Sequence, residues 1–572
     1  MHLAIMPFPI QKSCVPRRFH MKQTAASLVL LLGSGIALAQ FPPQITNVVV
    51  IFQENRTPDN LFHFLTPACP LRSPQFPVEL ALEACIPYRV TTSCYDISPC
   101  GISNQHGAPV PVTLTGRPLG GAIDPDHSHK GFINMCDPDP VTFQCRNDGA
   151  WRTSSPAGSS YAYVLNPAVT NYDGSSGHLL DPYNTLATQY GWANFMYQTN
   201  QGPSYPAHQF MFSGTSAPTA TADAGSMFVS ENFNGQIVGK NAGCLLLNGA
   251  GNDIVFPKAG VWPPGVDAFL KGCKTYAGGS VLDCPVQNQG LTASPESNGP
   301  GKTVGIYCYP HKSMADVLDP HNITWKYYAP SPGSIWSAPD SIKSICEPQW
   351  INPMFPSLGL QCTGKEWKAN VDTNNDGTDI LGDITNCKLA NVTWVIPDGK
   401  WSDHAGLDTQ YGPSWVAAVV NAIGNNPQCP AGTTDQGQTY WKNTAIVITW
   451  DDWGGWSDHE PARLLSTLPC TSTKCQGDYQ YGFRVPLIVV SAYTPQGYIN
   501  NDPHDFGSVL RMIEGINHLT EGQLGFADAR ATTDLHAFFS LTQPRAYTTI
   551  PAQQPANYFL TNTTPAVDPD DY

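Results

Sequence analysis

Charged side chains are scarce in this sequence: Asp, Glu, Lys and Arg together make up 13% of the 572 residues. Apolar residues, at 41%, are common enough to build a large core, while 50 glycines and 52 prolines indicate many turns and long ordered loops. The sequence has no internal repeat and no low-complexity linker. These features exclude a repetitive or disordered chain and favour a folded globule with many loops.

A hydrophobic run long enough to cross a bilayer is also lacking, since a spanning helix needs about 20 apolar residues. The apolar run in the segment that begins at Met21 is short and is broken by Gly-Ser-Gly at 33–35. Lys22 precedes the run and Ala-Leu-Ala ends it, which is the form of a secretory signal cleaved after Ala39; a membrane anchor is the alternative. We therefore expect an N-terminal extension and signal peptide in 1–39, and a secreted or periplasmic mature chain with no transmembrane segment.

CxxC pairs of the kind that hold zinc are missing, so metal binding by thiolates is not expected. The chain has 17 cysteines, of which only Cys14 precedes the expected cleavage point, and the mature chain therefore keeps an even number. An even number suits disulfide formation in an oxidising compartment. Three pairs are close enough in sequence to form local disulfides: Cys136/Cys145, Cys273/Cys284 and Cys470/Cys475.

Positive charge is in short supply, with 30 Lys and Arg against 45 Asp and Glu and a formal net charge of −15. Residues 1–39 carry four basic residues and no acid, so their removal would bring the net charge to −19. A chain this acidic repels nucleic acid and anionic surfaces at long range. Nucleic acid is therefore not expected as a partner, and an anionic substrate would need a local positive site, most simply a bound metal ion.

Four short runs rich in β-branched residues are predicted to be central strands, because they are continuously apolar rather than alternating. They are Ile45–Phe52, Asn391–Pro397, Thr444–Trp450 and Val485–Ser491. Helical patterns at 313–321, 414–426 and 506–519 lie among them. This alternation predicts an α/β fold with a mostly parallel sheet between helix layers.

Two stretches rich in Cys, Pro and Gly are expected to be loop insertions on that core. They cover about 65–120 and 220–300, and the whole of 40–572 is expected to form a single domain. A third loop, Asp372–Asp383, has a D-x-N-x-D-G pattern, which fits either a structural calcium loop or a plain Asn/Asp turn.

Polar residues follow three of the predicted strands directly. Glu54 and Asn55 follow the first, Asp451 and Asp452 follow the third, and His404 comes shortly after the second. In open α/β sheets, ligands gather at the carboxyl ends of strands. Adjacent aspartates repel each other unless a cation or proton lies between them, although a solvated turn is the alternative for such a pair. We expect an oxygen-rich site for a divalent metal, with Zn²⁺, Ca²⁺, Mg²⁺ and Mn²⁺ all open.

Three further residues bear on this site. Ser204 follows Gly-Pro in a turn and lacks the G-x-S-x-G elbow, but a metal ion can activate a serine without a histidine base. His127 and His129 follow two aspartates, and His127 is the stronger candidate, although either could be a solvated loop histidine. Asn55 opens an Asn-Arg-Thr glycosylation sequon, where we expect no glycan because it would block the proposed ligand.

The ordered series of these segments resembles the bacterial phosphoesterase family of non-haemolytic phospholipases C and related acid phosphatases. The similarity runs from about Ile45 to Asp534 through VVVIFQENRTPDNLF, DPDHSH, GPSYPAHQFMFSGT, CYPHKSMADVL, VIPDGKWSDHAG and IVITWDDWGGWSDHEPA. It implies a fold like that of the alkaline phosphatase superfamily, with the active site at strand ends. It also implies metal-dependent hydrolysis of a phosphoester, either a phospholipid or a soluble phosphomonoester, through a phosphoserine.

The resemblance also implies roles for individual residues. The implied metal ligands are Glu54, Asn55, Asp451 and Asp452, together with the nucleophile Ser204. The implied phosphoryl-contacting histidines are His127, His404 and, less securely, His311. His459 matches a recurrent position for which we expect a structural role.

The sequence departs from the family pattern in three places. The first motif usually continues Ser-Phe-Asp and here reads Thr-Pro-Asp at 57–59; the nucleophile motif usually continues Pro-Asn-Arg and here reads Pro-Ala-His at 206–208. The late pair is commonly Asp-Glu and here is Asp-Asp. These departures leave substrate preference open, and they keep a catalytically weak, secreted metal-binding or adhesion protein as the alternative function.

Two other hydrolase classes fit the sequence poorly. Adjacent carboxylates on one strand end cannot easily bracket a glycosidic bond, which needs a separation of about 5–9 Å. A sulfatase would normally carry a Cys/Ser-x-Pro-x-Arg segment, and the arginine is missing after Ser204. Aromatic residues near the motifs could form a lipid-binding rim, but most are expected in the core: Trp192, Tyr197, Tyr205, Trp453 and Trp456.

Overall fold

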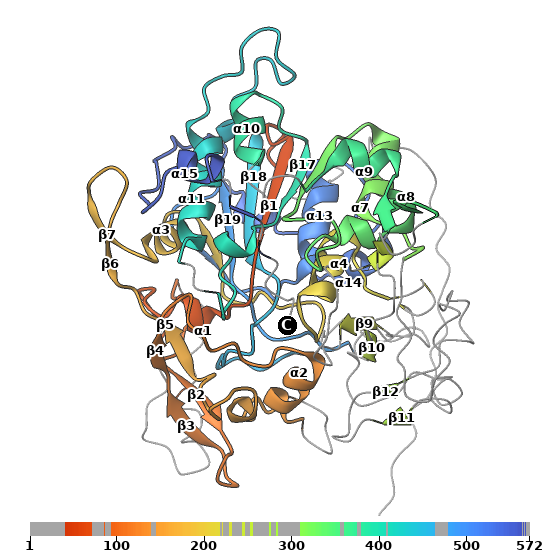
Figure 1. The fold of residues 1–572 in the computed structure, drawn as a ribbon. Coiled ribbons are helices and arrows are strands. Elements are labelled where there is room, and N and C mark those ends of the chain that lie inside the picture. Colours follow the sequence, from red (N-terminus) through yellow and green to blue (C-terminus); the bar gives the residue numbers. More distant parts are fainter. Residues whose placement is uncertain are drawn as a thin grey trace, which may run out of the picture. The chain divides into compact units, whose positions relative to one another are not determined.

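The computed structural model describes residues 41–70, 93–138, 145–217, 309–354, 360–373, 379–407, 410–463 and 479–562, with short pieces at Cys85, between 220 and 283, and between 564 and 567. Backbone contacts group the chain from Gln40 onward into one unit (Figure 1). Whether the chain is cleaved after Ala39 stays a prediction.

An eight-stranded sheet lies at the centre of this unit, in the order β16-β13-β17-β1-β18-β19-β8-β20. Its strands are β1 (Asn47–Gln53), β8 (Gly191–Ala193), β13 (Trp325–Tyr328), β16 (Val371–Asp372), β17 (Val392–Val395), β18 (Thr444–Trp450), β19 (Leu487–Ser491) and β20 (Tyr498–Asn500). Within this sheet β19 alone runs antiparallel to its neighbours. The predicted mostly parallel sheet is therefore confirmed, and each of the four predicted runs overlaps one of its strands.

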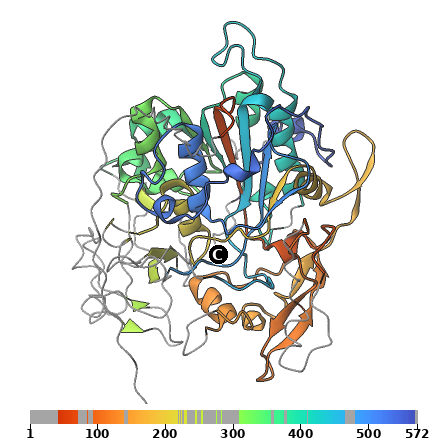
Figure 2. The same ribbon diagram turned by 180° about the vertical axis from the view of Figure 1, so that it is seen from behind.

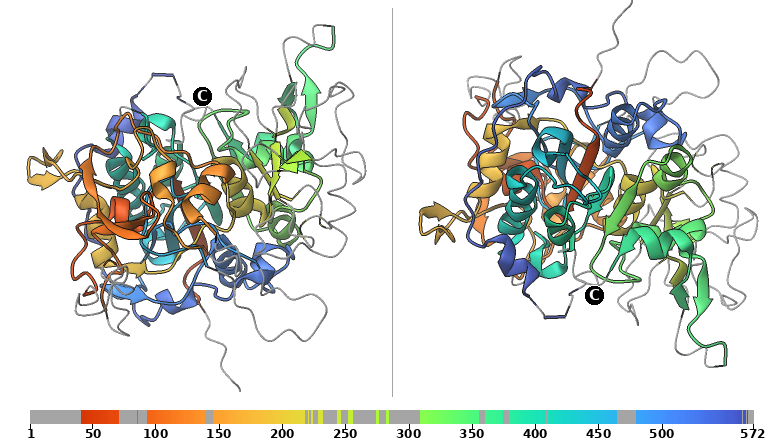
Figure 3. Two further views of the ribbon diagram at one scale, coloured as in Figure 1. Left: turned by 90° about the horizontal axis from the view of Figure 1, so that it is seen from below. Right: turned by 90° about the horizontal axis from the view of Figure 1, so that it is seen from above.

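Helices cover both faces of the sheet, which explains why its central strands are apolar throughout. One layer contains α3 (Asp181–Gln189), α10 (Asp379–Thr385), α11 (Gly412–Asn425) and α15 (Ala556–Leu560). The other contains α4 (Ser204–Ser213), α13 (Phe506–Ile516) and α14 (Ala527–Arg530). Figures 1 and 3 show the sheet between the two layers. Every residue of β1 and β18 is buried, so these two strands form the rigid centre of the core.

Sequence signals account for the ends of the layer helices. The Asp505 side chain caps α13 by accepting a hydrogen bond from the Ser508 amide. The Ser508 hydroxyl oxygen in turn accepts a hydrogen bond from the Asp505 amide. Helix α4 follows Pro203 and ends at Gly214, whose φ of +71° is left-handed. The predicted helix at 313–321 is divided into α7 (Met314–Leu318) and a short 3₁₀ turn, Asp319–His321.

Smaller elements surround the core. These are α1 (Pro58–Leu61), β2 (Cys100–Ser103), β3 (Val110–Thr113), β4 (Thr115–Arg117), α2 (His129–Cys136), β5 (Ala162–Val164), β6 (Ala168–Thr170), β7 (Ser176–His178), α8 (Lys343–Cys346), β14 (Pro348–Trp350), β15 (Leu360–Cys362), α9 (Lys365–Asn370) and α12 (Tyr440–Asn443). A separate four-stranded sheet joins β9 (Phe228–Glu231), β10 (Asn252–Val255), β11 (Lys274–Thr275) and β12 (Leu282–Asp283). Figure 2 shows these additions from behind.

Disulfide bonds hold several of the loops. The described pairs are Cys69–Cys94, Cys85–Cys100, Cys136–Cys145, Cys346–Cys362 and Cys387–Cys429. The predicted local pair Cys136/Cys145 is confirmed. The pairs Cys273/Cys284 and Cys470/Cys475 lie outside the described residues, as does most of the stretch at 220–300.

The ends of the predicted calcium loop are paired with a lysine. Lys326 Nζ lies 3.4 Å from an Asp372 oxygen and 2.5 Å from an Asp383 oxygen, and the Tyr328 hydroxyl donates to Asp383 at 2.7 Å. Residues 374–378 lie outside the described part of the chain, so calcium binding there stays a prediction.

The described segments contain no helix that combines the length and the hydropathy required to traverse a bilayer.

Candidate functional site

Parallel pairing of β1 with β18 places the two predicted ligand pairs side by side. Gln53, the last residue of β1, is in register with Trp450, the last residue of β18. Beyond these residues the Asn55 amide donates to Asp451 Oδ1 at 2.8 Å. Glu54, Asn55, Asp451 and Asp452 are all fully buried. These four polar side chains thus lie together at the carboxyl ends of β1 and β18. Asn55 is buried, which agrees with the expectation that its sequon carries no glycan.

Two glycines allow the chain after Asp452 to approach the first loop closely. A Cβ on Gly454, whose φ is +61°, would lie 2.3 Å from the Asn55 carbonyl oxygen. A Cβ on Gly455, whose φ is +67°, would lie 2.6 Å from Pro125 in the loop that carries His127. Asn55 itself has a φ of +60°, a conformation that Asn tolerates better than most residues. This strained, close-packed backbone is typical of functional sites.

Ser204 enters the same cluster as the first residue of α4. Its hydroxyl lies 3.3 Å from Glu54 Oε2 and 3.4 Å from Asp452 Oδ2. The amino end of a helix carries a partial positive charge, which favours negative charge near the serine. Three segments that are distant in sequence therefore converge, as the sequence predicts.

The electrostatics of this cluster favour a bound cation. Asn55 Oδ1 and Asp451 Oδ2 are buried and have no hydrogen-bond partner among the described residues. Burial raises the pKa of Asp451, partly offset by hydrogen bonds that include those from Ser204 and the Asn55 amide. Buried carboxylates with unpaired oxygens are costly unless they are paired or coordinate a metal. The donor set, rich in oxygen, fits a divalent metal ion.

His208 is a further member of the cluster. It lies one helical turn after Ser204 on α4, and its Nε2 is 3.1 Å from Glu54 Oε1. Glu54, His208 and Asp451 each offer a ligand atom, and these atoms lie within 4.8 Å of one another. In the sequence, His208 stands out only as a replacement for arginine. Its spacing of four residues from Ser204, which puts both side chains on one helix face, is the feature of the sequence that indicates a place in this cluster.

Two of the three predicted histidines flank this cluster. His127 Nε2 lies 3.2 Å from Asn55 Nδ2, and its Nδ1 lies 2.9 Å from the Pro125 carbonyl oxygen. The rings of His127 and His404 have centroids 5.7 Å apart. Asp124, His127 and His404 form a second group whose ligand atoms lie within 4.8 Å of one another. His127 thus lies against Asn55 with His404 beside it, and a contact of either histidine with substrate stays a prediction.

His311 lies in a different environment. Its Nδ1 is 3.0 Å from the Lys312 carbonyl oxygen, and its ring stacks on Tyr309 with centroids 4.9 Å apart. Burial lowers the pKa of His311 to about 4, so this imidazole is neutral at neutral pH. Tyr309 in turn stacks on Tyr205, next to Ser204. The connection to the cluster thus runs through two aromatic rings, and a catalytic role for His311 stays a prediction.

Arg56 and Gln53 hold the loop that carries His404. The Arg56 side chain donates to the carbonyl oxygens of Asp403 at 2.8 Å and Leu119 at 2.6 Å. Gln53 donates to the Trp401 carbonyl oxygen and accepts from the Asp403 amide. Burial lowers the pKa of Arg56 to about 10, which leaves it positively charged at neutral pH. This arrangement is not predictable from the sequence, because nothing in the residues next to Arg56 distinguishes it from an ordinary surface arginine.

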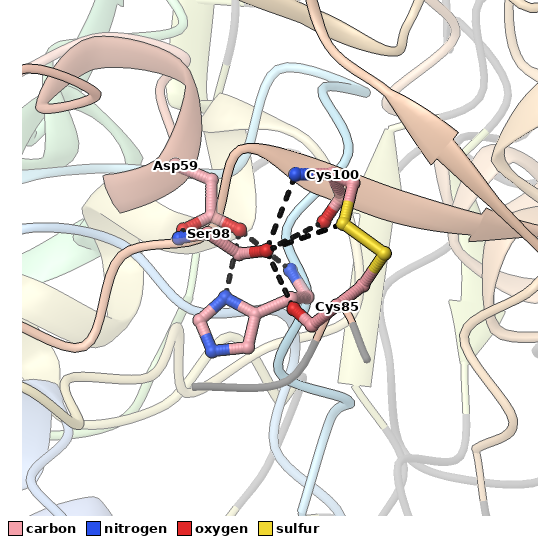
Figure 4. The surroundings of a disulfide bond; sticks show 5 residues. Asp59, Cys85, Ser98 and Cys100 are labelled. Carbon is pink, nitrogen blue, oxygen red and sulfur yellow. Dashed lines mark hydrogen bonds and ion pairs between the residues drawn. A yellow bond between two sulfur atoms is a disulfide. The ribbon is translucent and has the colours of Figure 1, made fainter. Parts of the chain in front are cut away.

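A second buried cluster lies beside α1. His459 Nδ1 is 2.7 Å from Asp59 Oδ2, and Arg484 pairs with Asp458 at 3.0 Å and with Asp96 at 3.2 Å. Asp59 also accepts from the Ser98 amide, next to the Cys85–Cys100 disulfide (Figure 4). Arg484 and His459 offset part of the negative charge of these carboxylates, so the cluster is a buried ionic network; a structural role for His459 stays a prediction.

The fold and the site define a class: a layered α/β protein in which the first serine of a helix lies among buried carboxylates at the carboxyl ends of parallel strands. The chain belongs to the Phosphoesterase family, whose profile matches residues 45–520. The family resemblance seen in the sequence is therefore confirmed.

Two curated relatives have names that state an activity. The chain is 29% identical over 162 residues to "Non-hemolytic phospholipase C" of Burkholderia pseudomallei, covering 26% of this chain and 22% of that protein. It is 25% identical over 148 residues to "Phospholipase C B" of Mycobacterium tuberculosis, covering 24% of this chain and 26% of that protein. The alignments thus span only about a quarter of the relatives' length.

A solved structure of a protein in the alkaline phosphatase superfamily from Vibrio parahaemolyticus is also similar. The identity is 8%, the alignment covers 60% of this chain and 62% of that chain, and the TM-score is 0.27.

Proposed function

We propose that this protein is a secreted, metal-dependent hydrolase of phosphate esters that uses Ser204 as its nucleophile. The observation that carries the proposal is the position of the Ser204 hydroxyl, 3.3 Å from Glu54 and 3.4 Å from Asp452, in a chain of the Phosphoesterase family. Secretion is supported by the disulfide-linked loops and by the signal-like N-terminal sequence.

Glu54, Asn55, Asp451 and Asp452 would hold the metal ion, with the Ser204 hydroxyl beside it. When bound, a divalent ion supplies positive charge that lowers the pKa of the serine hydroxyl and neutralises phosphoryl oxygens. The protein provides a water-excluding site and fixed side chains, which give these charges their full effect.

The reaction then proceeds in two steps. The Ser204 hydroxyl releases its proton to solvent, and its Oγ forms a bond to phosphorus as the bond to the alcohol oxygen breaks, while His404 or His127 donates a proton to the departing alcohol. A water molecule next attacks phosphorus and gives one proton to that histidine; the bond from phosphorus to Ser204 Oγ breaks, the phosphate product leaves, and Ser204 takes up a proton from solvent. His127 is suited to this task because it borders Asn55 and its side chain is 12% exposed.

The substrate class is proposed from the relatives. Their names identify them as phospholipases C, which favours a phospholipid over a soluble phosphomonoester for this chain. The five aromatic residues considered for a lipid-binding rim are buried, and they form part of the core or the site wall instead: Trp192, Tyr197, Tyr205, Trp453 and Trp456. Parallel assays with phosphatidylcholine vesicles and a soluble phosphomonoester distinguish the two substrate classes.

The nucleophile and one carboxylate can be tested by substitution. We expect Ser204→Ala and Asp451→Asn each to lower kcat by at least about 10²–10³-fold, because each removes a stabilising group at the reacting centre. Ser213→Ala is a matched control at the other end of α4 and should keep full activity. Activity of Ser204→Ala equal to that of the wild type, with circular dichroism showing a folded protein, would exclude the assignment.

The alternative function is a secreted metal-binding or adhesion protein on the same scaffold. It predicts a protein that binds one metal ion tightly but hydrolyses nothing in a panel of phosphomonoesters and phosphodiesters.

A further inference from the structure

We propose that His208 gives this metal site a nitrogen ligand, so that the site selects a borderline transition metal such as Zn²⁺ over Ca²⁺ or Mg²⁺. This inference rests on the metal site of the proposed function and goes beyond it by naming the class of metal. It concerns a residue in which this chain differs from the pattern that it resembles, since histidine stands at 208 where arginine is usual.

The hydrogen bonds around Tyr327 fix which imidazole nitrogen carries a proton. The Tyr327 hydroxyl donates its one hydrogen to the Trp336 carbonyl oxygen at 2.8 Å. His208 Nδ1 lies 3.4 Å from the same hydroxyl oxygen and must therefore be the donor.

The other nitrogen then points its lone pair at the carboxylates. His208 Nε2 faces Glu54 Oε1 at 3.1 Å, and an Asp451 oxygen belongs to the same group of ligand atoms. A lone pair and a carboxylate oxygen repel each other at this distance unless a proton or a metal ion lies between them. Histidine ligands commonly donate their second N–H to a neighbouring oxygen, as Nδ1 does here. The Tyr327 contact therefore prepares Nε2 to bind a cation.

The imidazole is also held in place. The His208 side chain is 0% exposed, and its ring lies edge-on to Phe52, with centroids 4.7 Å apart, and stacks on Trp336 at 6.4 Å. Its backbone is fixed in α4, one turn after Ser204. Because the buried ring packs against Phe52 and Trp336, its Nε2 is held facing the carboxylates.

A fixed nitrogen donor changes the choice of metal. Ca²⁺ and Mg²⁺ are bound almost entirely by oxygen, whereas Zn²⁺ and its neighbours in the transition series bind imidazole well. A guanidinium at this position would repel a cation, since it is always protonated. Replacement by histidine thus converts a position next to the carboxylates from a positive charge to a ligand.

The test compares metal binding by the wild type, His208→Gln and His208→Asn. Each protein is stripped with a chelator, and Zn²⁺ and Ca²⁺ affinities are measured by equilibrium dialysis with elemental analysis. We expect both substitutions to weaken Zn²⁺ binding by at least about 10–100-fold, since loss of a residue that only orients a metal ligand already costs that much. Ca²⁺ binding should change by less than about threefold, because the oxygen ligands remain. The exposed His178→Gln is the matched control and should change neither affinity.

Zn X-ray absorption gives a readout that does not depend on activity. The wild type should show imidazole scattering, and His208→Gln should lose one imidazole. Wild-type protein without imidazole at the metal, or equal losses of Zn²⁺ and Ca²⁺ affinity in the variants, would overturn the proposal. The wild-type spectrum decides the question even if neither variant folds.

Failure of this inference can be distinguished from failure of the proposed function. If the wild type hydrolyses phosphoesters with Ca²⁺, loses activity in Ser204→Ala and binds Zn²⁺ without imidazole, the metal inference is wrong and the function stands. If Zn²⁺ binding depends on His208 but no phosphoester is hydrolysed, the function is wrong and the metal inference stands.

Discussion

Single buried polar residues hold the loops of this site together. Arg56 is 1% exposed and donates to two backbone carbonyl groups and to Asn60 Oδ1, while its guanidinium lies 5.3 Å from the centre of the Trp456 ring. One of those carbonyl groups belongs to Asp403, which directly precedes His404. Arg56 is therefore a positioning residue that links the first ligand loop to a proposed proton donor.

Arg56→Met should destabilise the protein by about 3–5 kcal/mol, because it leaves buried acceptors without a partner and Asp403 without a neighbouring positive charge. Urea unfolding at pH 7 measures the loss. Arg146→Met, which removes a largely exposed ion pair with Asp137, is the control and should cost at most about 1 kcal/mol. Equal unfolding midpoints for Arg56→Met and the wild type would contradict the role given to Arg56.

At the scale of elements, the His459 cluster joins segments that carry both halves of the site. Asp59 lies in α1, shortly after Glu54 and Asn55, while His459 follows the turn after β18 and Arg484 precedes β19. Burial alone would lower the pKa of His459, but Asp59 and Asp96 outweigh it and raise the pKa to about 10. The charged groups around this imidazole are Asp59, Asp96, Asp458, Glu460 and Arg484.

This raised pKa predicts a stability that depends on pH. A protonated His459 stabilises the folded state fully below its unfolded pKa of 6.5, and this contribution is lost as pH rises toward about 10. His459→Gln should therefore be much less stable than the wild type at pH 6.5, and the difference should shrink steadily up to pH 10. Thermal unfolding across this range measures it; a difference that does not change with pH would show that His459 is not charged in the fold.

At the scale of the whole molecule, the metal site should couple ligand binding to folding. The four oxygen ligands come from loops that meet only in the folded chain, so the metal binds the folded state preferentially. Removing the ion with a chelator should lower Tm, and readdition at 100 times Kd should restore about 2.7 kcal/mol. Asp451→Asn should lose most of this response, whereas Ser213→Ala should keep it. Identical melting of chelated and metal-loaded wild type would contradict a metal at this site.

The N-terminal segment gives a second prediction at this scale. If residues 1–39 include a cleaved signal, the exported protein begins at Gln40. N-terminal sequencing or mass spectrometry of protein recovered from the medium or periplasm tests this. An intact Met21 on the exported protein would favour the membrane-anchor alternative.

Much of the fold follows from local patterns. The run Thr444–Trp450 coincides with β18, and the other three predicted runs differ from their strands by a few residues at the ends. The reversed direction of β19 was not predictable, because a fully buried strand is continuously apolar whichever way it runs. A strand that consists of one apolar run can therefore be predicted from the sequence. Its direction and its neighbours in the sheet cannot.

The sequence by itself determined the strands, the residues at their ends and the family. Strands buried on both faces are continuously apolar, and the family is identified by the order of its motifs, so both are local properties of the sequence. Only the tertiary structure decided that His208 faces Glu54, that Arg56 supports the His404 loop, and that His311 stands apart. The physical reason is that these roles depend on distances between side chains that are up to several hundred residues apart. Such distances are set by how the strands and helices pack, and no local pattern contains them.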